Sequence, residues 1–159
     1  VKITVLPIPD RVFQEAGGQV VMEAENFFVN ARHDSANTWW EGDVARQGFT
    51  GLNYMEAKQT RRQTFPQRYV GLAPELIYPI QFTNAGTYRV WIRAFSSDSF
   101  ADSVYVGLNG MERPIANAHQ FALDPELYKW SGDTRSRVPQ TLTVTEPLPD
   151  PASPRPIMR

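Results

Sequence analysis

The sequence predicts an all-β protein, folded as an antiparallel β-sandwich of the jelly-roll type. No window of about a dozen residues keeps apolar residues at helical spacing without an interrupting Gly or Pro. Segments with strand character are frequent, and Gly-containing turns such as "AGG", "NAG" and "LNG" separate them. Many short strands without helices between them are typical of sandwiches and jelly rolls.

The expected strands are short runs rich in β-branched and aromatic residues. They cover residues 2–6, 19–25, 52–57, 76–82, 87–95, 103–108 and 140–145. The clearest pair is an expected hairpin formed by the two strands within residues 86–110. Side chains alternate between the faces of a strand, so Tyr88 should face the core while Trp91 and Tyr105 face outward. The outward face therefore carries aromatic side chains.

Length and composition fit one domain with a single core. The chain has 159 residues, of which 42% are hydrophobic. We assign residues 1–146 to this domain and residues 147–159 to a C-terminal tail. The tail contains five prolines, which lack the N–H that a β-ladder needs, so it is expected to form no strand.

The charge and residue counts exclude several classes of function. With 16 basic and 17 acidic residues the net charge is −1, so no overall field favours nucleic acid or an anionic membrane as a partner. No apolar run approaches the roughly 20 residues of a membrane-spanning helix. The absence of Cys excludes disulfides and thiolate metal sites.

Two glutamates interrupt the apolar run "VVMEAENF" of residues 20–27. In a strand, Glu23 and Glu25 would point to one side, where two like charges are costly unless they are solvated or bound to a cation. Carboxylate oxygens are ligands that Ca²⁺ prefers, so a calcium site is one explanation. Solvated surface charges and a catalytic acid pair are the alternatives.

Adjacent tryptophans lie in the long segment 26–50, which is expected to be a loop. Trp39 and Trp40 are flanked by polar residues, in the stretch "NTWWEG". Sugar rings stack their apolar C–H faces on aromatic rings while their hydroxyl groups bind polar side chains, so this pair suits a glycan site. The alternative is that one ring plugs the end of the core. We expect at least one of the two to be exposed.

Two further long segments, 58–69 and 111–130, are expected to be loops that contribute to ligand binding. The first carries Arg61 and Arg62, which either are solvated or bind the carboxylate or sulfate groups of an acidic polysaccharide. The second carries His119 and Trp130, and Trp130 fits a core position equally well. No His-x-x-His or Cys cluster accompanies His119, so a transition-metal site is not expected.

The order of "EAE", "AGTYRVWIRAFSSDSFADSVYVGLNG", "YKW" and "TLTV" resembles the β-sandwich carbohydrate-binding modules related to families six and thirty-five, over residues 20–144. The resemblance implies a galactose-binding-like jelly roll, secreted or at the cell surface of a bacterium. It also implies that Glu23 and Glu25 help to hold a structural calcium ion. Such modules close with a further hairpin, where this chain has its Pro-rich tail. The open sheet edge that results would allow two copies to associate.

The resemblance therefore implies a non-catalytic domain that anchors a polysaccharide-active enzyme to its glycan. Two other functions remain open from the residues. The aromatic segments would also suit an adhesion or protein-interaction sandwich, and Glu23 with Glu25 would suit a small polysaccharide-cleaving enzyme.

Overall fold

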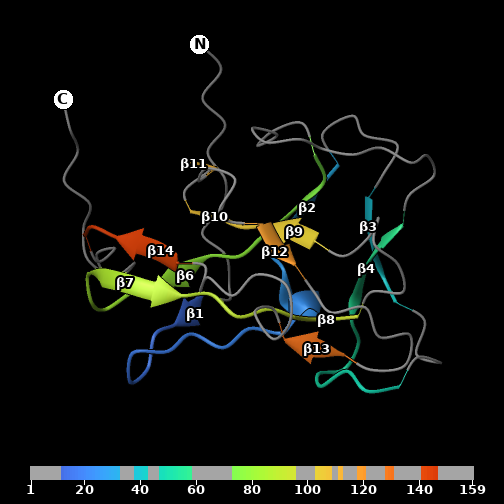
Figure 1. Cartoon of the computed structure of the whole chain (residues 1–159), viewed down its shortest axis with the longest axis horizontal. Helices are drawn as coiled ribbons and strands as arrows, with labels where there is room; N and C mark the ends of the chain where they lie inside the picture. Colours follow the sequence, from blue (N-terminus) through green and yellow to red (C-terminus); the bar gives the residue numbers. More distant parts are fainter. Residues whose placement is uncertain are drawn as a thin grey trace, which may run out of the picture.

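The computed structural model describes nine ranges of the chain: 12–32, 38–42, 47–58, 73–95, 103–108, 111–112, 118–120, 128–130 and 141–146. Expectations for residues 2–6, for Arg61 and Arg62, and for the tail 147–159 lie outside these ranges. The described residues form strands and one three-residue 3₁₀ turn, η1 (Ala24–Asn26), which confirms the all-β prediction (Figure 1). No helix among them is long and apolar enough to traverse a bilayer.

The strands are two to four residues long. In chain order they are β1 (Phe13–Gln14), β2 (Val29–Ala31), β3 (Thr38–Glu41), β4 (Met55–Lys58), β5 (Glu75–Ile77), β6 (Ile80–Gln81), β7 (Gly86–Arg89), β8 (Arg93–Ala94), β9 (Ser103–Tyr105), β10 (Gly107–Leu108), β11 (Met111–Glu112), β12 (Ala118–Gln120), β13 (Lys129–Trp130) and β14 (Thr141–Val144).

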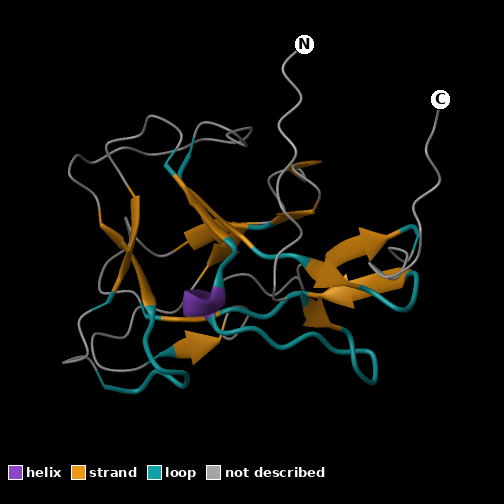
Figure 2. Cartoon of the chain, turned by 180° about the vertical axis from the view of Figure 1, so that it is seen from behind, coloured by secondary structure: helices purple, strands orange, loops and turns teal. Residues whose placement is uncertain are grey.

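The described strands pair into seven two-stranded ladders. One ladder is parallel, β1 with β6; the antiparallel ladders are β2–β5, β3–β4, β7–β14, β8–β13, β9–β12 and β10–β11. Figure 1 places β7–β14 at one end of the long axis and β3–β4 at the other. The view from behind shows the same order, with η1 between the two ends (Figure 2). Within the described ranges, these ladders do not join into the two continuous layers of a sandwich.

Five expected strands are confirmed in part, including residues 103–108, which β9 and β10 divide at Val106. β4 covers the second half of residues 52–57, β5 and β6 divide residues 76–82 at Tyr78 and Pro79, β7 and β8 divide residues 87–95, and β14 lies within residues 140–145. The expected strand over residues 19–25 is wrong. There the chain closes a tight turn through Gly17 and Gly18, whose φ angles of 61° and 80° suit glycine, and then coils into η1.

The expected hairpin within residues 86–110 is also wrong in its pairing. Its first segment pairs through β7 with β14 and through β8 with β13, and its second segment pairs through β9 with β12. The predicted alternation nevertheless holds: Trp91 is 54% exposed and Tyr105 is 46% exposed, whereas Val90 is partly buried. Period-two alternation sets which face a residue takes, but it carries no information about the partner strand.

The most deeply buried apolar side chains described are Phe82 and Val144, next to the β7–β14 ladder. The Phe82 ring packs against Tyr88 with 4.8 Å between ring centroids. Thr143 and Val144 are β-branched residues that pair with Thr87 and Gly86, which favours an extended backbone here. This end of the molecule therefore has a small core between the ladder and the preceding turn.

The same turn is held by a carboxylate. Glu15 is 7% exposed, and its side chain accepts hydrogen bonds from the backbone N–H groups of Thr83 (2.9 Å) and Asn84 (3.1 Å). The Asn84 amide donates a third bond at 2.8 Å, and the Tyr88 hydroxyl lies 2.8 Å from the carboxylate as a fourth donor. Glu15 thus joins the segment after β1 to the turn between β6 and β7.

These hydrogen bonds favour the ionised form of Glu15. The bonds from Asn84 and Tyr88 have the largest effect, outweigh the desolvation of the carboxylate, and lower its pKa from 4.5 to about 2. Burial raises the pKa of Tyr88, and the hydrogen bond to the Glu15 carboxylate raises it further. The carboxylate is therefore charged and the phenol is neutral at physiological pH, as this pairing requires.

Acid should destabilise the protein through Glu15. Between pH 4.5 and about 2 the unfolded chain binds a proton at this position and the folded chain does not, so stability falls as the pH falls through this window. We expect Glu15→Gln to lower the thermal midpoint at neutral pH and to weaken its dependence on acid. Thermal unfolding at several pH values tests this, with the exposed Glu41→Gln as the matched control. Parallel acid profiles for wild type and Glu15→Gln would contradict the assignment.

Candidate functional site

The tryptophan pair lies on a strand rather than on a loop. β3 (Thr38–Glu41) pairs with β4 in antiparallel register, so that Trp39 lies opposite Ala57 and Trp40 opposite Glu56. Segment 26–50 also contains β2, so its assignment as one long loop is wrong. Thr and Trp favour strands, but the polar residues around this four-residue run obscured the signal. Because the two rings are neighbours on a strand, they face opposite sides of the ladder.

Trp39 is the structural member of the pair. Its indole N–H donates to the carbonyl of Pro74 at 3.2 Å, and its own backbone carbonyl accepts a hydrogen bond of 2.8 Å from the Asn30 side chain. Pro74 precedes β5, and Asn30 lies in β2. Trp39 therefore ties the β3–β4 ladder to the β2–β5 ladder.

Trp40 is the accessible member. It is 48% exposed, which confirms that one ring of the pair reaches the surface. The guanidinium carbon of Arg32 lies 5.7 Å from the centre of the Trp40 ring, and Glu56 lies across the ladder on the same face. Trp40 is therefore an exposed aromatic ring that has a cationic and an anionic side chain as neighbours. No sequence pattern points to Arg32, which comes close to Trp40 only in the fold.

Glu23 and Glu25 do not share a strand face, because Glu23 precedes η1 and Glu25 lies within it. Their carboxylates nevertheless converge on residues 50–53. Glu25 Oε1 accepts hydrogen bonds from the backbone N–H of Leu52 (2.9 Å) and Asn53 (3.4 Å), and Glu23 Oε2 accepts one from the Thr50 hydroxyl (3.2 Å). The pair therefore holds a loop, a role that neither the surface-charge nor the catalytic interpretation included.

The 50–53 loop lies directly against the two glutamates, and a further contact holds η1. A Cβ at Gly51 would overlap Glu25 Oε1 and would lie 3.3 Å from Glu23 Cγ, so only glycine fits without displacement. η1 itself is held by Tyr78, whose hydroxyl donates to the Ala24 carbonyl at 2.8 Å. Burial, and then the charge of Glu25, raise the pKa of Tyr78, so the phenol remains a donor at physiological pH.

The residues at this loop fit calcium in ligand type. Two carboxylates and the Thr50 hydroxyl offer oxygen atoms, which Ca²⁺ prefers. Ca²⁺ takes about six to eight such ligands, and Glu25 Oε1 already accepts two N–H groups. In the described part of the chain, no three Asp, Glu, His or Cys side chains gather as a metal-binding group. A calcium ion here would be held by Glu23 and Glu25, and further oxygens would have to complete its shell.

The other predicted site residues are not brought to Trp40 by the described contacts. His119 lies in β12 opposite Val104, and Trp130 lies in β13 opposite Arg93, so both belong to strands rather than to the expected loop 111–130. Arg61 and Arg62 lie outside the described ranges. Trp91 is exposed, but the described contacts do not connect it to Trp40.

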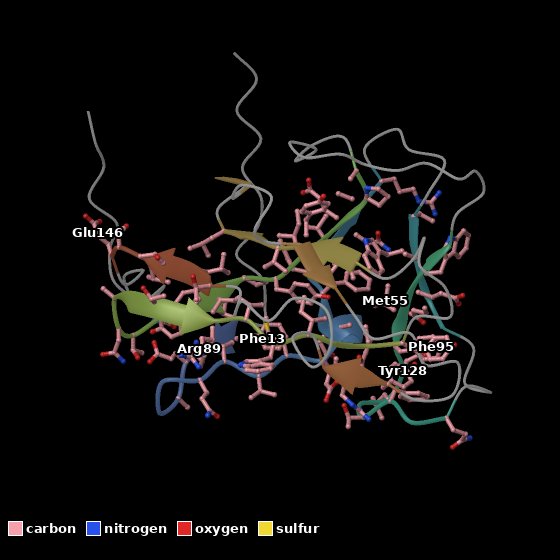
Figure 3. All side chains as sticks on the ribbon, viewed as in Figure 1. Phe13, Met55, Arg89, Phe95, Tyr128 and Glu146 are labelled. Carbon is pink, nitrogen blue, oxygen red and sulfur yellow. The ribbon has the colours of Figure 1, made fainter. Side chains whose placement is uncertain are left out.

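An aromatic cluster that the sequence analysis missed lies at the end of the β3–β4 ladder. Its rings are Phe49, Tyr54, Phe95 and Tyr128, with neighbouring centroids 5.4 to 6.3 Å apart. Figure 3 shows Phe95 and Tyr128 side by side near Met55, at the foot of β4. The four residues come from three distant segments, so no local pattern could have revealed them.

The chain is similar to a curated protein whose function is not given by its name. The chain is 26% identical over 148 residues to a protein of Formosa agariphila that bears the name "Uncharacterized protein P23". The match covers 79% of this chain and 36% of that protein, so the chain corresponds to about a third of the relative's length. No family model and no solved structure matches the chain.

The two glutamates should differ in their contribution to stability. Glu25 satisfies two backbone N–H groups, of which that of Asn53 is partly buried, whereas Glu23 accepts from one exposed hydroxyl that water can replace. We expect Glu25→Ala to lower the free energy of unfolding by about 1 to 2 kcal/mol and Glu23→Ala to lower it by less. Urea unfolding of both variants measures the difference. Equal losses, or a larger loss for Glu23→Ala, would show that the loop is not held in this way.

Proposed function

We propose that this chain is a non-catalytic carbohydrate-binding domain, a β-sandwich that attaches a secreted polysaccharide-active enzyme to its glycan. The observation that carries the proposal is Trp40, which is 48% exposed beside a neighbour that is held by hydrogen bonds. The apolar surface of an exposed indole is removed from water when a partner stacks on it, and the C–H face of a sugar ring is a suitable partner. A rigid strand beneath the ring presents it without a large loss of conformational entropy on binding.

The polar neighbours of Trp40 support a sugar more than a purely apolar partner. The Arg32 guanidinium, which lies over the Trp40 ring, can donate hydrogen bonds, and the carboxylate of Glu56, across the ladder from Trp40, can accept them. A sugar hydroxyl is both donor and acceptor, so it can use either group. Because the two charges have opposite sign, this face does not by itself select an acidic glycan. The acidic alternative depends on Arg61 and Arg62.

A protein-interaction domain is the second candidate. It is favoured by exposed apolar side chains that glycan binding does not require, among them Leu52 at 92% exposed and Val21 at 79%. The enzymatic alternative has less support, because Glu23 and Glu25 are engaged with residues 50–53 instead of flanking a substrate. A glycan array combined with an assay for released reducing sugar separates the three: binding without product supports our proposal.

Glycan binding should depend on Trp40. We expect Trp40→Ala to weaken binding to the glycan identified on the array by about 2 kcal/mol or more, because a stacked aromatic ring is a typical hot spot. Trp91→Ala is the matched control, since Trp91 is also exposed but belongs to another part of the fold. Isothermal titration of wild type and both variants gives the affinities. Normal binding by Trp40→Ala together with loss in Trp91→Ala would place the site on the other face.

A bound calcium ion would stabilise the fold. We propose that Glu23 and Glu25 hold Ca²⁺ beside the 50–53 loop, which predicts a higher thermal midpoint when calcium is added, since the ion would bind only the folded chain. The double variant Glu23→Ala, Glu25→Ala should lose this response. Magnesium serves as the control ion, because it demands stricter geometry than this loop offers. An unchanged midpoint in wild type, or the same rise in the double variant, would exclude the site.

A further inference from the structure

The face of the ladder that carries Trp40 continues beyond it. The backbone N–H of Gly42 donates to the carbonyl of Tyr54 at 2.8 Å, which extends the β3–β4 register by one residue pair. Residues two apart on a strand share a face, so Gly42 and Tyr54 lie on the side of Trp40. Diagonal neighbours across a ladder are about 7–8 Å apart, within reach of aromatic side chains. Trp40 and Tyr54 therefore stand next to each other on one surface.

Gly42 determines where the Tyr54 ring lies. A Cβ at position 42 would overlap the Tyr54 ring, so the ring rests directly over the glycine backbone. A larger residue at position 42 would lift the ring out of line with Trp40. The Tyr54 ring can therefore lie against the backbone of the ladder because Gly42 has no side chain.

Tyr54 connects the face that carries Trp40 to the aromatic cluster. Tyr54 meets Tyr128 edge to face, with 6.3 Å between ring centroids and 71° between ring planes. Gly48 lies beside Tyr128, where its φ of 98° favours glycine and a Cβ would be in ordinary contact with the ring at 3.4 Å. Both tyrosines are partly exposed, and the guanidinium of Arg93 lies 5.5 Å from the centre of the Tyr128 ring. Trp40, Tyr54 and Tyr128 form an aromatic strip along one end of the molecule.

We propose that this aromatic strip binds a linear oligosaccharide, with Trp40 stacking one sugar and Tyr54 contacting the next. The inference rests on the proposed function and adds the class of ligand: a chain of sugars rather than a single terminal sugar. Tyrosine and tryptophan supply apolar area together with a polar group, which suits successive sugar rings better than a lipid or an apolar peptide. Gly42 is the residue that determines this specificity.

Affinity as a function of chain length tests the strip. The probes are the monosaccharides glucose, xylose, mannose and galacturonic acid, with their linear hexasaccharides cellohexaose, xylohexaose, mannohexaose and hexagalacturonate. For the sugar that binds, wild type should prefer the hexasaccharide by about tenfold or more, the factor that about 1.4 kcal/mol of added contact provides. Gly42→Ala should reduce hexasaccharide affinity to near that of the monosaccharide. Glu41→Ala, on the opposite face of the ladder, is the control that retains the preference.

A second measurement needs no variant at the strip. Chemical nitration of exposed tyrosines, mapped by mass spectrometry, should show Tyr54 protected by the hexasaccharide and unprotected by the monosaccharide. Equal affinity for both lengths, with loss of both in Trp40→Ala, would overturn the strip and leave the proposed function standing. Binding of none of the eight sugars and of no glycan on the array would contradict both the strip and the proposed function. Tyr54 nitrated equally with and without bound hexasaccharide would overturn the strip alone.

Discussion

The described structure depends on side chains that form hydrogen bonds with backbone N–H groups outside its very short strands. Strands of two to four residues in two-stranded ladders leave much of the backbone without a ladder partner. A backbone N–H without a hydrogen bond is costly once water is excluded, so side chains have to supply acceptors. Glu15 does so for the partly buried N–H groups of Thr83 and Asn84, and Glu25 does so for that of Asn53. In both places one carboxylate joins segments that are far apart in sequence.

This use of carboxylates explains why acidic residues occur in apolar sequence. A carboxylate that accepts several N–H bonds is stabilised in its charged form, as the lowered pKa of Glu15 shows. The same chemistry makes the Glu23 and Glu25 pair compatible with a cation, because both roles require ionised oxygens. Hydrogen bonding to the 50–53 loop and calcium binding are therefore not exclusive: the loop bonds orient the carboxylates, and an ion would use the oxygen lone pairs that remain.

The sequence predicted the local features of this protein and missed the long-range ones. Fold class, the alternating exposure near Trp91 and the exposure of one tryptophan follow from composition and from the two-residue period of a strand. The strand over residues 19–25 failed because the same residues also suit a 3₁₀ turn, which Tyr78 holds from 54 residues away. The hairpin failed because partner choice depends on burial and on distant segments such as β14. Arg32 and the aromatic cluster became visible only when such segments met.

The register between β3 and β4 determines which of the two tryptophans is exposed and which is held by hydrogen bonds. A shift of one residue between β3 and β4 would exchange their faces, bringing Trp39 to the surface and burying Trp40. The hydrogen bonds of Trp39 to Pro74 and Asn30 oppose that shift, because the shift would break both of them. Trp39 thus holds the register that exposes Trp40. The same register places Gly42 opposite Tyr54, so the whole aromatic strip depends on one partly buried side chain on the opposite face of the ladder from the proposed ligand.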